Sequence, residues 1–349
     1  MRRFSRGLVI GKLAPLHLGH EHLVAAARAA CDEVVVLSYC DPEPPGCEAE
    51  RRRRWCAARF PFARAWVVTP GWLAERAPGR AMPADADDGA AHRDFVAWLL
   101  GDVLGAPVDA VFTSEDYGEP LAAALTAHRR RRAAPAPAVV HVAVDPDRRV
   151  VPISGRAIRA DVHAHRRWLA PEVYASFVRR VAILGGESSG KTTLAAALAR
   201  RFETAWVPEY GRELWMERGG RLDSADLLRI AEEQVAREEA ALLSSHRFLF
   251  CDTTPLTTRF YADVMFGAAE PRLEELSRRA YDAVVLCAPD FAFVQDGTRQ
   301  GEAFRARQHA WYREALAGTA VIEAQGGLED RVEAVGRALG ARHAAPCHA

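Results

Sequence analysis

The same short pattern occurs twice in this 349-residue chain: an apolar run, a glycine-containing loop and a helical segment. The first copy is residues 8–10 followed by "GKLAPLHLGH", and the second is residues 181–184 followed by "GGESSGKTT". Short, continuously apolar runs that alternate with helical segments are typical of parallel strands buried on both faces. The pattern therefore predicts an α/β chain with two parallel sheets, and its length suits two domains.

Further runs of the same kind set the expected domain organisation. In the first domain we expect strands at residues 7–10, 33–38, 65–68, 110–113, 139–144 and 150–153. In the second we expect them at residues 180–184, 205–207, 248–251, 283–286 and 320–323. A loop rich in Pro, Gly and Asp is expected at residues 70–91. The predicted division is a first domain at residues 1–170, a hinge helix at 171–179 and a second domain at 180–349.

Composition excludes several classes of protein. The formal net charge is zero, which argues against a nucleic-acid-binding protein with its usual basic excess. Neither a signal peptide nor an apolar run of about 18 residues is evident, so we expect a cytoplasmic protein without membrane partners. The seven cysteines are scattered without a C-x-x-C pair, which predicts inert, reduced thiols. Of the 46 basic residues only Lys12 and Lys191 are lysines, and both lie in the glycine-containing loops.

The second loop fits G-x-x-x-x-G-K-[ST] in full and lies between a strand and a helix, as a phosphate-binding loop must. Its backbone amides are expected around the phosphates of ATP, with Lys191 at the β- and γ-phosphates. The predicted ATP-binding residues of this loop are Gly185, Gly186, Glu187, Ser188, Ser189, Gly190, Lys191, Thr192 and Thr193.

Two residues are predicted to bind Mg²⁺ beside this loop. The Thr192 hydroxyl is the first expected ligand. Asp252 ends the apolar run "FLFCD" and is the expected second ligand, the alternative being a helix or turn cap.

Two further segments complete a predicted small-molecule kinase. "PEYGRELW" follows a strand, and there Glu209 is a candidate to accept the proton of a substrate hydroxyl. The substrate-binding candidates in this segment are Glu209, Tyr210, Arg212 and Trp215, with packing an equal alternative for the two aromatic residues. The segment that begins with "DGTR" predicts a mobile lid that carries Arg299, Arg305 and Arg307, or else an ordinary amphipathic helix. A switch GTPase is disfavoured because no N-K-x-D motif occurs.

The histidines of the first loop allow three interpretations. His17, His20 and His22 could coordinate zinc, but no fourth ligand lies nearby in the sequence, so we expect no structural zinc. A hydrolytic nucleophile is not supported because no G-x-S-x-G is present. A phosphate cradle fits best, since a strand ends in a glycine loop that opens a helix.

A second loop, "ISGRAIR" at residues 153–159, supports the cradle. Ser154 is a candidate N-cap, and Arg156 and Arg159 lie one turn apart, so this loop could bind phosphates from the other side. The predicted ATP-binding residues of the first domain are Gly11, His17, Gly19, His20, Ile153, Ser154, Arg156 and Arg159. The arginine run at residues 51–54 is expected to form a solvated helix face, with a phosphate contact as the alternative.

These two loops resemble the two signatures of the nucleotidyltransferase superfamily, G-x-[FL]-x-P-x-H-x-G-H and I-S-x-[TS]-x-[IL]-R, although Arg156 stands near where Ser or Thr is common. Joined to "VAILGGESSGKTTL" and "PEYGRE", the chain resembles the NadR-type family, which joins nicotinamide-mononucleotide (NMN) adenylyltransferase to ribosylnicotinamide kinase. "RRRRW", "FTSEDYG", "VDPDRRV" and "DGTR" extend the resemblance. It implies an N-terminal Rossmann-like nucleotidyltransferase sheet and a C-terminal P-loop kinase sheet.

The resemblance also implies two reactions of NAD salvage. The kinase half would phosphorylate nicotinamide riboside with ATP and Mg²⁺, and the other half would transfer adenylate from ATP to NMN, giving NAD and pyrophosphate. His17 and His20 would contact ATP phosphates, assisted by Lys12 and Arg159. The NMN-binding candidates are Trp98, Asp116, Tyr117 and Asp145, with core packing the alternative for Trp98.

Alternatives remain open at this level. The same folds could pair a pantetheine-phosphate adenylyltransferase with a dephospho-coenzyme A kinase, or form a regulator that senses ATP and NAD with weak turnover. Some NadR-type members carry an N-terminal helix-turn-helix, but only six residues precede the first expected strand, so we expect no DNA binding by that route. The expected partners are ATP, nicotinamide riboside, NMN and NAD, and a homo-oligomer stays possible.

Overall fold

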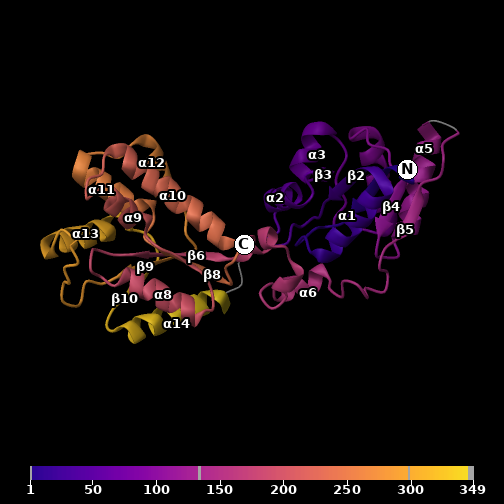
Figure 1. Ribbon diagram of the computed structural model, residues 1–349. Coiled ribbons are helices and arrows are strands. Elements are labelled where there is room, and N and C mark those ends of the chain that lie inside the picture. Colours follow the sequence, from indigo (N-terminus) through magenta and orange to yellow (C-terminus); the bar gives the residue numbers. More distant parts are fainter. Residues whose placement is uncertain (1, 133–134, 298, 345–349) are drawn as a thin grey trace. The chain divides into compact units, whose positions relative to one another are not determined.

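The computed structural model describes residues 2–132, 135–297 and 299–344. The chain forms two compact units, Met1–Ser176 and Phe177–Ala349, and each contains a five-stranded parallel sheet (Figure 1). The expected hinge helix is shorter than predicted, because α7 (Pro171–Tyr174) gives way to a 3₁₀ turn at Ala175–Phe177. The amide of Arg179 then donates to the Arg247 carbonyl at 2.9 Å, which draws this residue into a strand.

The first sheet has the strand order β3-β2-β1-β4-β5, with every pair parallel. The strands are β1 (Phe4–Ile10), β2 (Cys31–Ser38), β3 (Arg64–Val67), β4 (Ala110–Thr113) and β5 (Val140–Ala143). Alternate residues of β1 point to opposite faces, and Leu8 and Ile10 pack against Phe95 and Leu121 on one of them. The opposite face carries α1.

The first unit surrounds this sheet with helices. They are α1 (Leu18–Ala30), α2 (Ala49–Arg59), α3 (Pro70–Arg76), α4 (Gly89–Trp98), α5 (Gly118–Arg132) and α6 (Gly155–Ala160). The expected loop at 70–91 is therefore wrong at both ends, where Thr69 and Asp88 cap α3 and α4. The strand expected at 150–153 is also absent, because the Asp145 carboxylate accepts the amides of residues 149–151 that a ladder would need.

The second sheet has the order β10-β9-β6-β8-β7, and its pairs are again parallel. The strands are β6 (Arg179–Leu184), β7 (Trp206–Val207), β8 (Phe248–Asp252), β9 (Ala283–Cys287) and β10 (Val321–Ala324). Val181 and Ile183 face the core shared with α8 and α14, whereas Ala182 and Leu184 pack with Tyr312 on the other face.

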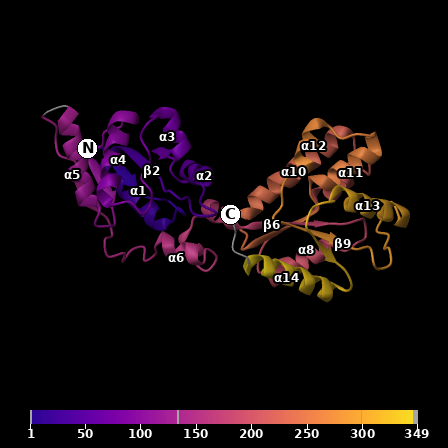
Figure 2. The same ribbon diagram turned by 180° about the vertical axis from the view of Figure 1, so that it is seen from behind.

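The helices of the second unit form layers on both faces of its sheet (Figures 1 and 2). They are α8 (Lys191–Arg201), α9 (Tyr210–Glu217), α10 (Ser224–Leu242), α11 (Pro255–Phe266), α12 (Pro271–Ser277), α13 (Glu302–Ala315) and α14 (Leu328–Ala344). In both views α8 and α14 lie on one side of the sheet and α10, α11 and α12 on the other. Both units thus have the covered parallel sheet that continuous apolar strands require.

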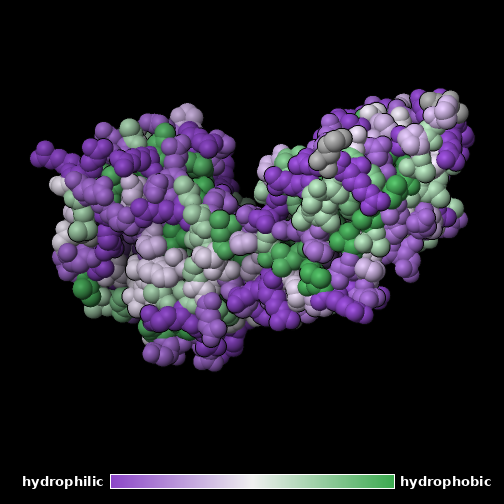
Figure 3. Space-filling view, turned by 45° about the vertical axis from the view of Figure 1, so that its right-hand side comes forward, coloured by the Kyte–Doolittle hydropathy of each residue, from purple (hydrophilic) through white to green (hydrophobic). Residues whose placement is uncertain are grey.

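In each unit the first strand lies at the centre of the sheet, with neighbours added on both sides. Loops at the carboxyl ends of such central strands surround a crevice where α/β proteins bind ligands. Among the described residues, no helix has both the length and the apolar character needed to cross a bilayer. The face in Figure 3 is dominated by hydrophilic residues with smaller hydrophobic areas between them.

Candidate functional site

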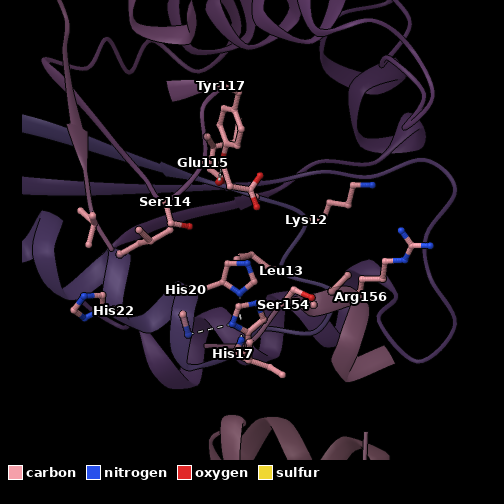
Figure 4. A pocket seen from close by; sticks show the side chains of 18 of the residues that line it. Lys12, Leu13, His17, His20, His22, Ser114, Glu115, Tyr117, Ser154 and Arg156 are labelled. Atoms are coloured by element: carbon pink, nitrogen blue, oxygen red, sulfur yellow. Dashed lines mark hydrogen bonds between the residues drawn. The ribbon is translucent and has the colours of Figure 1, made fainter. Parts of the chain in front are cut away.

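The first unit has a cavity of about 520 Å³ at the carboxyl ends of β1, β4 and β5 (Figure 4). Most of the candidates from the sequence line it, and their loops come from distant parts of this unit. They are Gly11, Lys12, His17, Gly19, His20, Tyr117, Asp145, Ile153, Ser154, Arg156 and Arg159. The two signature loops therefore meet at one cavity, and Gly155 comes so close to the first loop that an added Cβ would lie 3.3 Å from the Ala14 carbonyl oxygen.

His17 and His20 cap α1, and their rings contact each other in a tilted arrangement with 3.9 Å between the ring centroids. His17 Nδ1 accepts the Gly19 amide at 3.1 Å, and His20 Nδ1 accepts the His17 amide at 3.2 Å. Because both Nδ1 atoms are acceptors, a neutral ring must carry its proton on Nε2. This reciprocal cap fixes the tautomer of both rings and leaves both Nε2–H groups as donors for an anion.

Burial and neighbouring cations keep both rings neutral. Burial lowers the pKa of His17 to about 4, helped by the charges of Arg148 and Arg159. Burial also lowers the pKa of His20 well below its usual value, together with the charges of His17 and Arg148. At neutral pH the pair therefore offers hydrogen-bond donors without adding positive charge.

Two cations of this cavity, Lys12 and Arg159, are held by contacts with other segments of the first unit. Lys12 Nζ forms an ion pair with Asp85 at 2.7 Å, and the Lys12 side chain is half exposed. Arg159 donates to the Ala14 carbonyl, which ties the second signature loop to the first. Ser154 caps α6 by accepting the Ala157 amide at 3.2 Å, as its position in the sequence predicts.

Two predicted NMN contacts lie outside the cavity. Trp98 packs beside Phe95 at 5.9 Å between ring centroids, with the Arg80 guanidinium over its ring, so the core alternative is correct for it. Asp116 is exposed and does not line the cavity, whereas Tyr117 does and donates to the Ile10 carbonyl at 2.9 Å. Asp145 lines it too, but its carboxylate is engaged by the backbone of its own loop.

Sequence reasoning did not single out several cavity residues. Arg148 lies in "VDPDRRV", lines the cavity and pairs with Glu115 at 2.8 Å. Tyr39 and His92 also line it, and the Tyr39 hydroxyl lies 2.8 Å from His92 Nδ1. Arg148 follows a strand end, a position that could have drawn attention to it, but nothing local links Tyr39 to His92.

The second unit places the predicted phosphate loop between β6 and α8. Gly190, the residue before α8, has φ +79°, which a residue with a side chain rarely adopts. It offers no side-chain cap, and the first bond of the helix joins the Leu194 amide to the Gly190 carbonyl. The amides of the first turn, from Lys191 onward, are thus left for an anion. Lys191 Nζ lies 3.0 Å from the Gly186 carbonyl oxygen, inside the loop.

Thr192 and Asp252 meet as predicted. The Thr192 hydroxyl donates to Asp252 Oδ2 at 2.5 Å, although the two residues are 60 positions apart. Asp252 is buried, and its Oδ1 has no hydrogen-bond partner among the described residues. Burial raises the pKa of Asp252 to about 6, with a further contribution from the charge of Glu209.

A second cavity of about 270 Å³ adjoins the phosphate loop. Three of the predicted loop residues line it, namely Glu187, Ser188 and Lys191. The other six residues of the predicted ATP-binding set do not line it; they are Gly185, Gly186, Ser189, Gly190, Thr192 and Thr193. The cavity therefore adjoins one side of the loop only.

The structure shows where the side chains of three of those six positions lie, while the predicted phosphate contacts of this loop are made by its backbone amides. Gly185 is packed under the loop, where an added Cβ would lie 2.7 Å from Ser189 Oγ and 2.8 Å from the Cys287 carbonyl oxygen. Ser189 is fully buried, and its Oγ has no hydrogen-bond partner among the described residues, so this hydroxyl lies inside the loop. Thr193 is exposed in the first turn of α8 and offers the loop only its backbone amide.

The substrate candidates of the kinase-like unit divide between this cavity and the core. Glu209, Arg212 and Trp215 line the cavity. Tyr210 does not: it is buried in a separate apolar cluster, under the guanidinium of Arg237, so its role is packing.

Of the three predicted lid arginines, only Arg299 lines this cavity. Arg305 is buried and donates to the Phe291 carbonyl at 2.9 Å, so it anchors the segment rather than the ligand. Arg307 is exposed on α13 above the ring of Phe304.

The cavity also contains contacts that the sequence analysis did not assign. Glu187 of the phosphate loop accepts the Tyr261 hydroxyl at 3.1 Å and the Gln300 amide at 2.7 Å. Arg212 pairs with Asp296 at 3.1 Å. The segment that carries Arg299 is therefore linked to the phosphate loop and to α9. Tyr261 lies on α11 with no signal in its neighbourhood that could have revealed it.

The described residues contain no group of three His, Cys, Asp or Glu side chains placed to hold a metal ion. Figure 4 shows His22 apart from the contacting pair of His17 and His20. Six cysteines are buried free thiols, and Cys347 lies outside the described residues.

Comparison with known proteins finds relatives over most of the chain. An AAA-domain family profile matches residues 180–331. The "Trifunctional NAD biosynthesis/regulator protein NadR" of Escherichia coli (strain K12) is 28% identical over 84% of this chain and 71% of its own. Its namesake from Salmonella typhimurium (strain LT2) is 28% identical over 85% of this chain and 72% of its own.

Solved structures show the same relationship at the level of fold. A NadR crystal structure in complex with NAD and AMP-PNP superposes with a TM-score of 0.67 at 18% identity, covering 97% of this chain and 96% of that one. A NadR structure in complex with NR gives a TM-score of 0.66 at 19% identity, covering 96% of each chain. The chain is therefore a homologue of the NadR proteins, with their two-unit α/β fold.

Proposed function

We propose that this protein is a bifunctional enzyme of NAD salvage. Its second unit phosphorylates nicotinamide riboside with ATP, and its first unit transfers adenylate from a second ATP to the resulting NMN. One observation carries the proposal: each unit has its own phosphate loop after its central strand, and each loop opens onto its own cavity. The names and ligands of the NadR relatives supply the substrates.

In the first unit, an oxygen of the NMN phosphate attacks the α-phosphorus of ATP. A new P–O bond forms, the bond between the α-phosphorus and the bridging oxygen breaks, and pyrophosphate leaves with that oxygen. The Nε2–H groups of His17 and His20 donate to the phosphate oxygens, where charge builds up. Lys12 and Arg159 lie at the same cavity and offset the charge of the leaving group. No covalent intermediate with the protein is needed.

In the second unit, the 5′-oxygen of the riboside attacks the γ-phosphorus, ADP leaves, and the hydroxyl proton passes to Glu209. Lys191 and the free amides of α8 hold the β- and γ-phosphates. The donor set fits Mg²⁺, because the unpartnered Oδ1 of buried Asp252 and the Thr192 hydroxyl are hard oxygen ligands beside the loop. When bound, Mg²⁺ would neutralise charge on the transferring phosphate.

Trp215 forms a wall of this second cavity and is the residue we expect against the flat pyridine ring. Arg212 and Arg299 line the same cavity and would face the phosphate rather than the ring. The conformation of Arg212 depends on Asp296, to which it is paired.

The deciding experiment incubates the protein with ATP, Mg²⁺ and nicotinamide riboside and identifies the products by mass. We expect ADP, NMN, NAD and pyrophosphate. Parallel reactions contain phosphopantetheine or dephospho-coenzyme A in place of the riboside. The coenzyme A alternative would be favoured if those acceptors are turned over and the riboside reaction forms no NAD. A sensor would be favoured if the protein binds ATP and NAD but turns over none of the acceptors.

A further inference from the structure

The four arginines at residues 51–54 are consecutive in the sequence and occupy very different environments in α2. Arg51 and Arg53 approach helix carboxylates at 3.5 and 3.7 Å, and Arg54 is exposed. Arg52 has 0% of its side chain exposed. None of the four lines either cavity, so the solvated-face expectation is wrong for Arg52 and the phosphate alternative gains no support.

The buried guanidinium of Arg52 instead reaches the backbone of the first phosphate loop. Its Nη1 donates to Ser38 Oγ at 2.8 Å and approaches the Lys12 carbonyl oxygen at 3.4 Å. Ser38 Oγ in turn donates to that same carbonyl at 2.7 Å. On the other side of the guanidinium, Nη2 pairs with Glu43. The Lys12 carbonyl is therefore held both by Arg52 and by a hydroxyl that Arg52 orients.

This arrangement is an inefficient way to stabilise a helix. Arg52 is taken wholly out of water, its one carboxylate partner is partly exposed, and its Nε has no hydrogen-bond partner among the described residues. A buried charge of this kind is often no more stabilising than a well-packed apolar residue. What it supplies here is a fixed backbone at Lys12, whose side chain lines the ATP cavity.

We propose that Arg52 is a positioning residue for adenylyl transfer, acting through Ser38 and the Lys12 backbone rather than on the substrate. The inference rests on the proposed function of the first unit. Kinase turnover in the same preparation reports that the second unit is intact, and thermal unfolding compared with wild type reports whether the first unit is folded. The matched control is Arg54, an exposed arginine two residues away on the same helix.

The test measures adenylyl transfer from ATP to NMN in Arg52→Met, Arg54→Met, Lys12→Met and the double variant of Arg52 and Lys12. We expect Arg52→Met to lower kcat at least about tenfold, since a misplaced catalytic group commonly loses that much or more. Arg54→Met should stay within about twofold. On the Lys12→Met background the Arg52 change should lower kcat less than about threefold, because residues that act through one another are not additive.

Two milder variants keep the test decisive if Arg52→Met does not fold. Arg52→Lys preserves the charge but not the forked contact, so we expect partial recovery relative to Arg52→Met. Ser38→Ala removes only the hydroxyl and should lower kcat in the same direction, again with little further loss on the Lys12→Met background.

A kcat for Arg52→Met within about twofold of wild type would overturn the inference, and so would an equal loss with and without Lys12. If Arg52→Met does not fold, the inference is overturned by a kcat of Ser38→Ala within about twofold of wild type. It is also overturned if Ser38→Ala lowers kcat equally with and without Lys12. Failure of the wild-type protein to form NAD from NMN is a different result, because it would remove the proposed function itself.

Discussion

The two phosphate loops follow the same strand-loop-helix path and differ in where their hydrogen-bond donors come from. In the second unit α8 starts without a side-chain cap, so its own amides are free for phosphate. In the first unit the side chains of His17 and His20 cap α1, and the donors that remain are imidazole Nε2–H groups. Equal topology therefore does not mean equal chemistry: one site is made by backbone, the other by side chains.

The largest expected effect falls on the backbone-built site. Lys191→Ala should lower phosphorylation of the riboside by about 10³-fold, since it removes a cation that lies inside the phosphate loop. Adenylyl transfer from ATP to supplied NMN should be unchanged. Both rates are measured in the same preparation, and a parallel fall in the two would break the comparison.

The side-chain-built site allows its capping and binding roles to be separated. Asn caps helices well, so His17→Asn should keep the cap while removing the Nε2 donor. We expect adenylyl transfer to fall about 10²-fold with an unfolding free energy within about 0.5 kcal/mol of wild type. His17→Ala should lose activity similarly and also about 1 kcal/mol of stability. Equal activity of the Asn variant and wild type would show that capping is the whole role of His17.

The contributions of His17 and Asp252 to the free energy of unfolding should change in opposite directions with pH. His17 has a pKa of about 4 when folded and 6.5 as its ordinary value, so its neutral form is favoured by folding. Stability then falls as pH drops from 6.5 to 4, on the order of 3 kcal/mol in total. The pKa of Asp252 is raised to about 6, so its protonated form is favoured and stability rises as pH drops through 6.

Unfolding of His17→Asn and Asp252→Asn is compared with wild type between about pH 4 and 7 to check these signs. The advantage of the His17 variant over wild type should grow towards the acid end of this range. The advantage of the Asp252 variant should grow towards neutral pH. A difference that does not change with pH in either pair would mean that the group titrates alike in the folded and unfolded chain.

The smallest expected effect concerns Lys12, whose contacts differ from those of Lys191. Lys191 lies against a carbonyl of its own loop, whereas Lys12 is paired with a carboxylate 73 residues away. Asp85→Asn frees the Lys12 ammonium, and we expect the KM for ATP in adenylyl transfer to fall about threefold, the scale of a half-exposed ion pair. Stability should change by less than about 1 kcal/mol. A raised KM would show that Asp85 positions Lys12 rather than competing with the phosphates.

Both sheets and both loops could be predicted from the sequence because they depend on local signals. Apolar runs, glycines and cap residues are read directly from neighbouring positions, as with Ser154 and Gly190. Prediction failed where the burial or the hydrogen bonds of a residue depend on a contact that the pattern of neighbouring residues does not mark. The phosphate-loop motif could be read from the sequence, but the burial of the Ser189 hydroxyl beside Gly185 could not, because the motif does not specify where its side chains point.

The same limit applies outside the loops. The burial of Arg52 depends on Ser38 at the end of β2 and on Glu43 in the loop between β2 and α2. Trp98 joins the core because α4 lies on α5. The strand expected at 150–153 does not form because the Asp145 carboxylate accepts backbone amides that a strand would use to pair with its neighbour.

Reciprocal knockouts test the claim of two independent phosphate sites most directly. Lys191→Ala, His17→Asn and an equal mixture of the two are each given ATP, Mg²⁺ and nicotinamide riboside, and NMN and NAD are quantified over time. We predict that the Lys191 variant forms NMN about 10³-fold more slowly than wild type, that the His17 variant forms NMN normally but NAD about 10²-fold more slowly, and that the mixture forms NAD faster than either variant alone. Loss of both reactions in a folded His17 variant, loss of NAD formation from supplied NMN in a folded Lys191 variant, or a mixture that makes no NAD would contradict two independent sites.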